Sequence, residues 1–337
     1  MKVCVVGAGA IGGLVAVKLA AAGEEVTVVA RGPHLAAIRE RGLVLREEGR
    51  EQVARVRAVE RVPEAGPQDV IVLGMKAHQV AAVAADVGAL LGPDTAVVTA
   101  QNGIPWWYFH RHGGPLQGTR LESVDPGGVI AAALPVERIV GSIIYPAAEI
   151  AEPGVVQHVE GNRITVGEPD GTETERVKAI AELLRRGGFK ARIASDLRSE
   201  IWVKLWGNCT FNPVSALTHA TLDELCTFPP SRALCMEMMR EAQAIGEKLG
   251  ARFGVSLEKR IAGAAAVGAH KTSTLQDVES GRPIELEALL GSVLELGRLT
   301  GVPTPHLSAV YGCASLLART LGREQGRIRI EKVPRMV

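Results

Sequence analysis

The chain has 337 residues, of which 47% are hydrophobic and 22% charged, close to the averages of globular proteins. At about 150 residues per domain, this length predicts roughly two domains. The 38 basic and 37 acidic side chains give a net charge of +1, which excludes a global attraction to nucleic acid or to acidic membranes. We therefore expect neither of these partners. The composition also excludes collagen-like, low-complexity and disulfide-scaffold proteins.

The first 30 residues predict a βαβ unit. The pattern predicts a strand at 3–6, a helix at 14–22 and a second strand at 26–29, with a glycine-rich turn between the first strand and the helix. The apolar stretch imitates a secretory signal, but the ordered glycines favour a dinucleotide site. Gly7 allows the tight turn, Gly9 lets the backbone approach a pyrophosphate, and Gly12 lets helix and strand pack closely. The helix N-terminus would attract the phosphates.

The alternation of strands and helices continues, with strands at 70–73 and 96–99 and helices at 33–41 and 79–91. This alternation predicts an α/β fold with a Rossmann-type, doubly wound parallel sheet. Residues 105–137 have no clear period. Strands at 138–145, 154–160, 163–166 and 189–193 and a helix at 173–186 follow. Only helical patterns come after residue 195, at 197–217, 221–226, 231–250, 256–268, 285–300 and 305–320. We therefore expect a dinucleotide-binding domain at 1–195, an all-helical substrate and catalytic domain at 196–325, and a C-terminal tail at 326–337.

The end of the second strand predicts the cofactor. NAD enzymes place a carboxylate there, whereas this chain has Arg31, whose planar donors suit a 2′-phosphate. We therefore expect NADP(H), the alternative being a solvated surface arginine. Lys76 and Asn102 follow the strands at 70–73 and 96–99, at the edge where such sheets bind ligands. Asn102 and the glycine after it are equally typical of a simple turn.

A polar row runs along the helix predicted at 197–217. Lys204, Asn208 and Asn212 are spaced i, i+4, i+8, which aligns them on one face of an otherwise apolar helix. Because burying such groups unpaired is costly, the face either meets solvent or lines a polar cavity that suits an oxygen-rich ligand. Pro213 should kink or end the helix just after Asn212. Farther on, Glu285 should lie in the first turn of a helix, as a site residue or as a partner of the helix dipole.

Several stretches resemble the ketopantoate reductase family over nearly the whole chain. They are GAGAIGG with Arg31, GMKAHQ, AQNG, EIWVKLWGNCTFNPVSALT, KTSTLQDVESGRPIELEALLG and residues 301–305. The resemblance implies a Rossmann domain joined to an all-helical domain. It also implies NADPH-dependent reduction of a 2-keto acid to a 2-hydroxy acid, with 2-dehydropantoate to pantoate, a step of pantothenate biosynthesis, as the expected case.

The resemblance also implies roles for individual residues. Lys204 corresponds to the catalytic lysine, and Glu285 to the acid that contacts the hydroxyl or ketone end of the substrate. Arg31 and Lys76 correspond to cofactor contacts, and Asn102 lies between nicotinamide and substrate. The remaining substrate contacts would come from Asn208, Asn212 and Ser273, with the serine on the carboxylate.

Residues 104–137 depart from the family pattern. They begin with Trp106 and Trp107, and we expect them to shape substrate choice near the active site or to pack against the second domain or a partner subunit. A bulkier 2-keto acid is therefore one alternative substrate. Two other functions remain open: a β-hydroxyacid dehydrogenase acting on another 2- or 3-hydroxy acid, and a non-catalytic NADP(H)-binding redox sensor.

Three further expectations concern the setting of the protein. The five cysteines, at scattered spacings without a CxxC pair, predict reduced buried thiols in a cytoplasmic protein. The eight histidines lack metal-ligand spacing, so we expect no metal site. The apolar helices after residue 285 would suit either a homodimer interface or a core.

Overall fold

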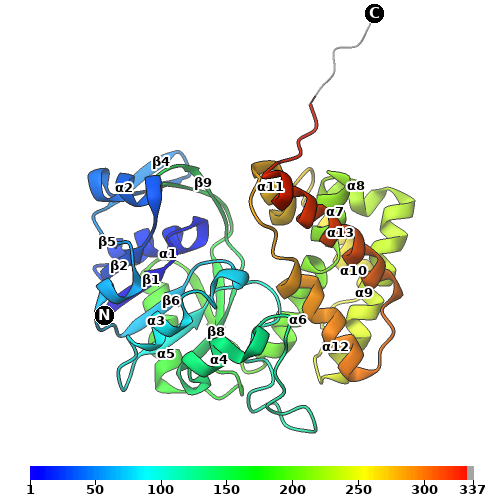
Figure 1. Cartoon of the computed structure of the whole chain (residues 1–337), viewed down its shortest axis with the longest axis horizontal. Coiled ribbons are helices and arrows are strands. Elements are labelled where there is room, and N and C mark those ends of the chain that lie inside the picture. The colour runs from blue at the N-terminus through cyan, green and yellow to red at the C-terminus, as the bar shows by residue number, and fades with distance from the viewer. Residues whose placement is uncertain (332–337) are drawn as a thin grey trace, which may run out of the picture. The chain divides into compact units, whose positions relative to one another are not determined.

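The computed structural model describes residues 1–331, and the chain divides into two compact units, Met1–Arg198 and the part from Ser199 onward. The division falls within α6 (Leu197–Asn208), so the boundary expected after residue 195 lies just before it. Of the expected tail at 326–337, residues 332–337 lie outside the described residues. Figure 1 shows the strands of the first unit and the helices of the second.

The first unit is built on a sheet of eight strands within the described residues, in the order β12-β11-β8-β7-β6-β1-β2-β5. All neighbouring strands are parallel except β8 and β11, which confirms the predicted parallel-rich α/β fold. The strand bounds are β1 (Lys2–Val6), β2 (Glu25–Val29), β5 (Arg57–Val59), β6 (Val70–Leu73), β7 (Ala96–Thr99), β8 (Ile139–Ile144), β11 (Arg163–Gly167) and β12 (Lys190–Ile193).

Five α-helices accompany this sheet within the described residues: α1 (Ala10–Ala21), α2 (Gly32–Arg41), α3 (Ala84–Gly88), α4 (Val129–Ala133) and α5 (Glu175–Arg186). The helix predicted at 79–91 is wrong in extent. A 3-10 turn at Ala77–Gln79 and the short α3 replace it, separated by hydrogen-bonded turns. The α5 helix begins where its N-cap Thr174 side chain accepts a hydrogen bond from the Val177 amide, which satisfies one of the first-turn donors.

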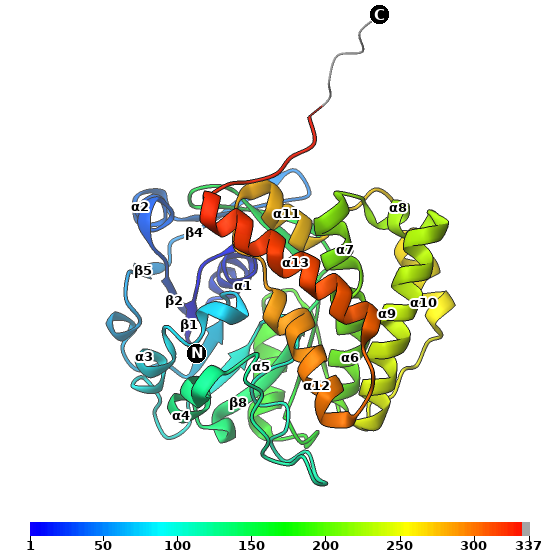
Figure 2. The same cartoon turned by 45° about the vertical axis from the view of Figure 1, so that its right-hand side comes forward.

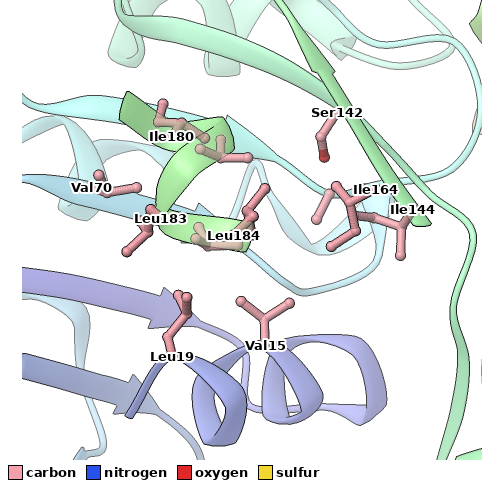
Figure 3. Close-up of a pocket in the computed structure, with 12 residues that line it drawn as sticks. Val15, Leu19, Val70, Ser142, Ile144, Ile164, Ile180, Leu183 and Leu184 are labelled. Carbon is pink, nitrogen blue, oxygen red and sulfur yellow. The ribbon is translucent and has the colours of Figure 1, made fainter. Parts of the chain in front are cut away.

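The main core of this unit lies where α1 and α5 meet the sheet, and it contains a small cavity of about 20 Å³ (Figure 3). Aliphatic side chains such as Val15, Leu19 and Leu184 line the cavity. Ser142 also lines it, but its hydroxyl already donates a hydrogen bond to the Thr99 carbonyl. A space of this size and polarity is a packing defect rather than a ligand site.

A second sheet of four strands covers α1 in the same unit. Its order is β4-β3-β10-β9, formed by β3 (Leu43–Glu47), β4 (Arg50–Ala54), β9 (Ala147–Glu152) and β10 (Val155–Glu160). A Cβ built on Gly13 of α1 would lie 2.6 Å from a methyl group of Val156 on β10, so the sheet approaches the helix closely. Only β10 was predicted from the sequence.

The second unit is helical throughout the described residues, which confirms the predicted helical fold. After α6 come α7 (Phe211–Thr218), α8 (Leu222–Thr227), α9 (Pro229–Lys248), α10 (Leu257–Ala265), α11 (Ser273–Ser280), α12 (Ser292–Thr300) and α13 (Pro305–Glu324). A π-helical turn at Glu287–Gly291 leads into α12. Figure 2 shows α13 lying across α7 and α9, with which it is in contact.

The core of the second unit centres on two fully buried tryptophans of α6. Trp202 and Trp206 are both 0% exposed, and the Trp206 indole N–H donates to the Met239 carbonyl of α9 at 2.7 Å. Some apolar side chains after residue 285 join this core, because Leu290 and Val293 are buried and α12 packs on α9, whereas Leu299 and Leu316 are exposed. Core packing therefore accounts for the buried side chains only, and a homodimer interface stays a prediction. The α11 helix was not predicted.

Candidate active site

The glycine turn between β1 and α1 has no room for a side chain at two positions, Gly7 and Gly12. Gly7 has φ +93°, and a Cβ there would lie 2.9 Å from the backbone nitrogen of Met75. A Cβ on Gly12 would collide with the Gly7 carbonyl oxygen. The amides of Gly7 and Ala8 both donate to the Val29 carbonyl at 3.1 Å, which fixes the turn to the end of β2. The two glycines thus do what the sequence predicted of them.

The N-terminus of α1 is open to a ligand. Gly9 is its N-cap residue, no side chain caps the helix, and no acidic residue stands in its first turn. A Cβ on Gly9 would meet nothing within 4 Å, so its backbone borders open space. Uncapped amides and the positive end of the helix dipole suit an anion. The residues present therefore fit the pyrophosphate of a dinucleotide cofactor.

Arg31 lies directly after β2 and is the N-cap residue of α2. Its side chain is exposed, and among the described residues no carboxylate forms an ion pair with it. An arginine with no internal partner at this end of β2 suits a ligand phosphate.

Lys76 and Asn102 lie at the same edge of the sheet, because β6 and β7 are parallel neighbours that end shortly before them. Gln101 ties the two strand ends together. Its side-chain Nε2 donates to the carbonyls of Leu73 at 2.6 Å and Met75 at 3.1 Å. This placement agrees with ligand binding beyond the carboxyl ends of parallel strands. The contacts of Lys76 and Asn102 with a cofactor stay predictions.

One side chain that the sequence analysis did not single out contacts the glycine turn. The Nε2 atom of His34 on α2 lies 2.7 Å from the Ala8 carbonyl oxygen, and its Nδ1 atom accepts a hydrogen bond from the Gly154 amide at 2.9 Å. The available signal was the position of His34, three residues after Arg31.

In the helical unit, Lys204 and Glu285 interact electrostatically. The pKa of Lys204 is lowered to about 8, because burial disfavours the charged amine more strongly than the carboxylate of Glu285 favours it. Both side chains are partly buried. The prediction for the position of Glu285 was off by one residue, since it directly precedes Leu286, the first helical residue. A buried lysine with a pKa near 8 can release a proton close to neutral pH.

The continuous helix predicted at 197–217 is wrong. The α6 helix ends at Asn208, and α7 begins at Phe211 after a break at residues 209–210. Pro213 lies in the first turn of α7, where its missing N–H removes no helical hydrogen bond, so it starts a helix rather than ending one. Lys204 and Asn212 therefore belong to different helices, and the i, i+8 alignment does not hold.

Two of the predicted substrate residues nevertheless meet across α7 and α11. The Nδ2 atom of Asn212 donates to the Ser273 hydroxyl at 3.4 Å. Asn212 is 7% exposed, whereas Ser273 is the exposed first residue of α11. The side chain of Asn208 is partly buried and has no hydrogen-bond partner within residues 1–331. Amides and a hydroxyl in this arrangement can bind the oxygen atoms of a small acid.

Residues 104–137 fold into the first unit. Trp107 is 2% exposed, and its ring lies where a Cβ on Gly141 of β8 would be, so it packs directly on the sheet. Arg198 holds the loop by donating to the carbonyls of Tyr108 and His110. Trp107 is therefore a core residue of this unit, and a role of the loop in substrate choice stays a prediction.

The expectation of buried thiols also needs one correction. Cys4, Cys209, Cys226 and Cys235 are buried, but Cys313 is exposed. Burial raises the pKa of the Cys4 and Cys209 thiols to about 12, so both stay protonated and unreactive near neutral pH. Residues 1–331 hold no group of three or more His, Cys, Asp or Glu side chains placed to bind a metal ion. No helix in that range has the length and apolar character needed to cross a membrane.

Two family models match the chain. Ketopantoate reductase PanE/ApbA matches residues 3–112, and ketopantoate reductase PanE/ApbA C terminal matches residues 196–318. The chain is 52% identical to 2-dehydropantoate 2-reductase of Mesorhizobium japonicum over 327 residues, which are 97% of this chain and 99% of that protein.

Solved structures share the fold. The crystal structure of a ketopantoate reductase homologue from Ralstonia solanacearum has a TM-score of 0.91 at 43% identity, covering 95% of this chain and 98% of that one. D-mandelate dehydrogenase, in its ternary structure with NADH and anilino(oxo)acetate, has a TM-score of 0.81 and covers 96% of this chain and 100% of its own. At 22% identity, this second likeness shows the fold alone.

Proposed function

Because the chain belongs to the ketopantoate reductase family, we propose that it reduces 2-dehydropantoate to pantoate with NADPH as the cofactor and Lys204 as the proton donor. The family uses a nicotinamide cofactor and acts on a small 2-keto acid. When bound, that cofactor supplies a hydride to the ketone carbon. The oxygen on that carbon then gains negative charge, and the chain must stabilise and protonate it.

Lys204 meets both requirements. A protonated amine with a pKa of about 8 is mostly charged at neutral pH and still acidic enough to give up its proton as the alkoxide forms. Glu285 opposes the effect of burial and so keeps a larger fraction of the amine protonated. We assign Glu285 a second role, in which its carboxylate accepts a hydrogen bond from a hydroxyl group of the substrate.

The polar groups of α7 and α11 would bind the rest of the substrate. Asn212 and Ser273 already share a hydrogen bond, so an incoming carboxylate would find an amide and a hydroxyl held close together. Asn208 ends α6 one turn beyond Lys204 and has donor capacity to spare among the described residues. Charge-assisted hydrogen bonds to a carboxylate are stronger than the neutral bond they would replace.

The preference for NADPH over NADH rests on Arg31. A guanidinium at the end of β2, without an internal ion pair among residues 1–331, favours the 2′-phosphate that distinguishes the two cofactors. Asn102 and Lys76, at the carboxyl edge of the sheet, would contact the cofactor beyond the pyrophosphate.

The observation that carries the proposal is the electrostatic pairing of Lys204 with Glu285, which gives the chain a proton donor active near neutral pH. The test is consumption of NADPH and of NADH by the purified chain with 2-dehydropantoate, followed by the absorbance of the reduced cofactor. We expect the highest kcat/KM with 2-dehydropantoate and NADPH. A higher kcat/KM with an aromatic 2-keto acid would overturn the substrate assignment, and equal use of the two cofactors would overturn the role of Arg31.

The alternatives raised by the sequence find less support. The main reason to expect a bulkier acid was the loop at 104–137, and Trp107 of this loop packs on β8 instead. A redox sensor that only binds NADP(H) has no need of a lysine whose pKa lies near neutral pH.

A further inference from the structure

We propose that His34 is a positioning residue for the cofactor, which holds both the glycine turn and the start of α2 in the arrangement that binds the pyrophosphate and the 2′-phosphate of NADPH. The inference rests on the cofactor assignment proposed above. It adds a residue that would touch no ligand atom and would act through Gly9 and Arg31.

His34 orients the peptide bond between Ala8 and Gly9. The Ala8 carbonyl oxygen accepts a hydrogen bond from Nε2 of His34 at 2.7 Å. Because a trans peptide is planar, its C=O and N–H groups point in opposite directions. Fixing the Ala8 carbonyl toward His34 therefore turns the Gly9 N–H away from it. The backbone of Gly9 borders open space, so this donor is held ready for an anion.

His34 also fixes the start of α2. His34 is the third residue of that helix, whose N-cap is Arg31. The hydrogen bond from His34 to Ala8 therefore links the N-terminus of α2 to the N-terminus of α1. The direction of the Gly9 amide and the position of Arg31, the two proposed phosphate contacts, thus depend on one imidazole.

The far side of the imidazole is anchored by a turn that cannot easily move. Gly154, between β9 and β10, donates its amide to Nδ1 of His34 and accepts a hydrogen bond from the Val44 amide at 2.9 Å. Its φ is +80°, and a Cβ there would lie 2.9 Å from the Ala37 side chain of α2. The second sheet therefore supplies a fixed donor against which the ring is oriented.

These two partners define the protonation state of His34. Nδ1 must accept and Nε2 must donate, so the ring is neutral, with its proton on Nε2. Burial lowers the pKa of His34 below its ordinary value, while the hydrogen bond to the Ala8 carbonyl raises it. Protonation at low pH would place an N–H against the Gly154 amide and break that hydrogen bond.

The charged groups on the surrounding elements are bonded to other groups or exposed. Arg41 of α2 donates to the Pro153 carbonyl and lies 3.8 Å from Glu152 of β9. Glu152 also pairs with Arg46 of β3 at 3.0 Å. Arg39 of α2 donates to a backbone carbonyl of β5. The glycine turn contributes no charge, and Arg31 at the start of α2 is exposed.

The test compares three variants by calorimetric titration with NADPH. His34→Ala removes both hydrogen bonds. His34→Gln keeps one donor and one acceptor at similar spacing but never takes up a proton. His158→Ala is the matched control, because His158 is another partly buried histidine of this unit, bonded to Glu47 and Gly161 on a different part of the second sheet.

We expect His34→Ala to weaken NADPH binding about tenfold, as for lost hydrogen bonds to a site that must stay ordered. It should raise KM for NADPH and leave kcat at saturating cofactor nearly unchanged. His34→Gln and His158→Ala should bind NADPH like the wild type at neutral pH. As the pH falls below the ordinary histidine pKa of 6.5, the wild type should lose more affinity than His34→Gln, because only the wild type protonates this ring. The 2′-phosphate titrates in both, so the difference isolates His34.

Two outcomes would overturn the inference while leaving the proposed function intact. One is equal affinity of His34→Ala and the wild type for NADPH, and the other is identical pH dependence of the wild type and His34→Gln. If His34→Ala does not fold, the pH dependence of NADPH binding in the wild type and in His34→Gln still tests the inference. A wild type that binds no NADPH would instead overturn the proposed function itself.

Discussion

Replacing Glu285 with Gln should move the alkaline limb of the pH–rate profile to lower pH. Burial disfavours the charged form of Lys204 and lowers its pKa from 10.5 to about 8, while the Glu285 carboxylate favours the charged form. Removing the carboxylate leaves burial unopposed, so the pKa of Lys204 falls below its wild-type value. The protonated, active amine is then lost at a lower pH.

The size of the wild-type effect follows from the pKa of about 8. Keto acid reduction should be constant below about pH 7 and should fall tenfold per pH unit well above the pKa. At pH 9 about one-tenth of the activity should remain, whereas a lysine with its ordinary pKa of 10.5 would keep nearly all of it.

The assay is kcat for 2-dehydropantoate at saturating NADPH, measured across neutral and alkaline pH for the wild type, Glu285→Gln and Lys204→Ala. Lys204→Ala should lack the alkaline limb of the pH–rate profile, and its kcat should be lower than that of the wild type by about 10²–10⁴-fold. A wild-type limb near the ordinary lysine pKa would refute the reasoning. So would a Glu285→Gln limb that stays in place or moves to higher pH.

Three further substitutions test other parts of the structure. Arg31→Ala should weaken NADPH by about 1–3 kcal/mol and leave NADH nearly unchanged in parallel titrations; an equal loss for both cofactors would contradict the 2′-phosphate contact. Trp107→Ala should lower the free energy of unfolding by about 3–5 kcal/mol in urea, because it empties a buried site on β8; a folded variant of unchanged stability but altered keto acid ranking would restore the loop to the active site. Val15→Ile should fill part of the cavity of about 20 Å³ and raise stability by up to about 0.5 kcal/mol in thermal unfolding; a loss would show overpacking.

The sequence predicted the parts of the fold where local pattern and tertiary role agree. The buried strands of the large sheet are short β-branched runs, and the glycine spacing of the first turn has one common structural explanation. The small sheet was harder, because β4 reads Arg-Glu-Gln-Val-Ala with four exposed residues and shows no clear alternation. Its strands form because they pair with segments distant in the sequence and pack on α1. The residues of one short stretch of sequence do not reveal either contact.

The candidate site shows the same division. Lys204, Asn212 and Ser273 were identified from their residue types and from the family resemblance, but the break between α6 and α7 was not. The mostly apolar stretch from Trp202 to Ala216 contains two helix-weakening residues, Gly207 and Pro213. A single glycine occurs inside many helices, and an α-helix tolerates proline in its first turn, so neither residue marks the break by itself. His34 escaped notice because its role depends on two backbone partners, at residues 8 and 154, that only the folded chain brings to it.

The two adjacent glycines of α1 constrain sequence change in different ways. A side chain on Gly12 meets the Gly7 carbonyl, an obstacle made of backbone that no substitution elsewhere can remove. A side chain on Gly13 collides with the methyl group of Val156, on the sheet that covers the helix, and lies at ordinary contact distance, 3.4 Å, from the Ala8 carbonyl oxygen. Residue 13 can therefore covary with residue 156, a small residue at one permitting a larger one at the other, whereas residue 12 has no such compensating partner. In a random mutant library, second-site suppressors of Gly13→Ala should arise at Val156, and suppressors of Gly12→Ala should not arise by shortening a neighbouring side chain.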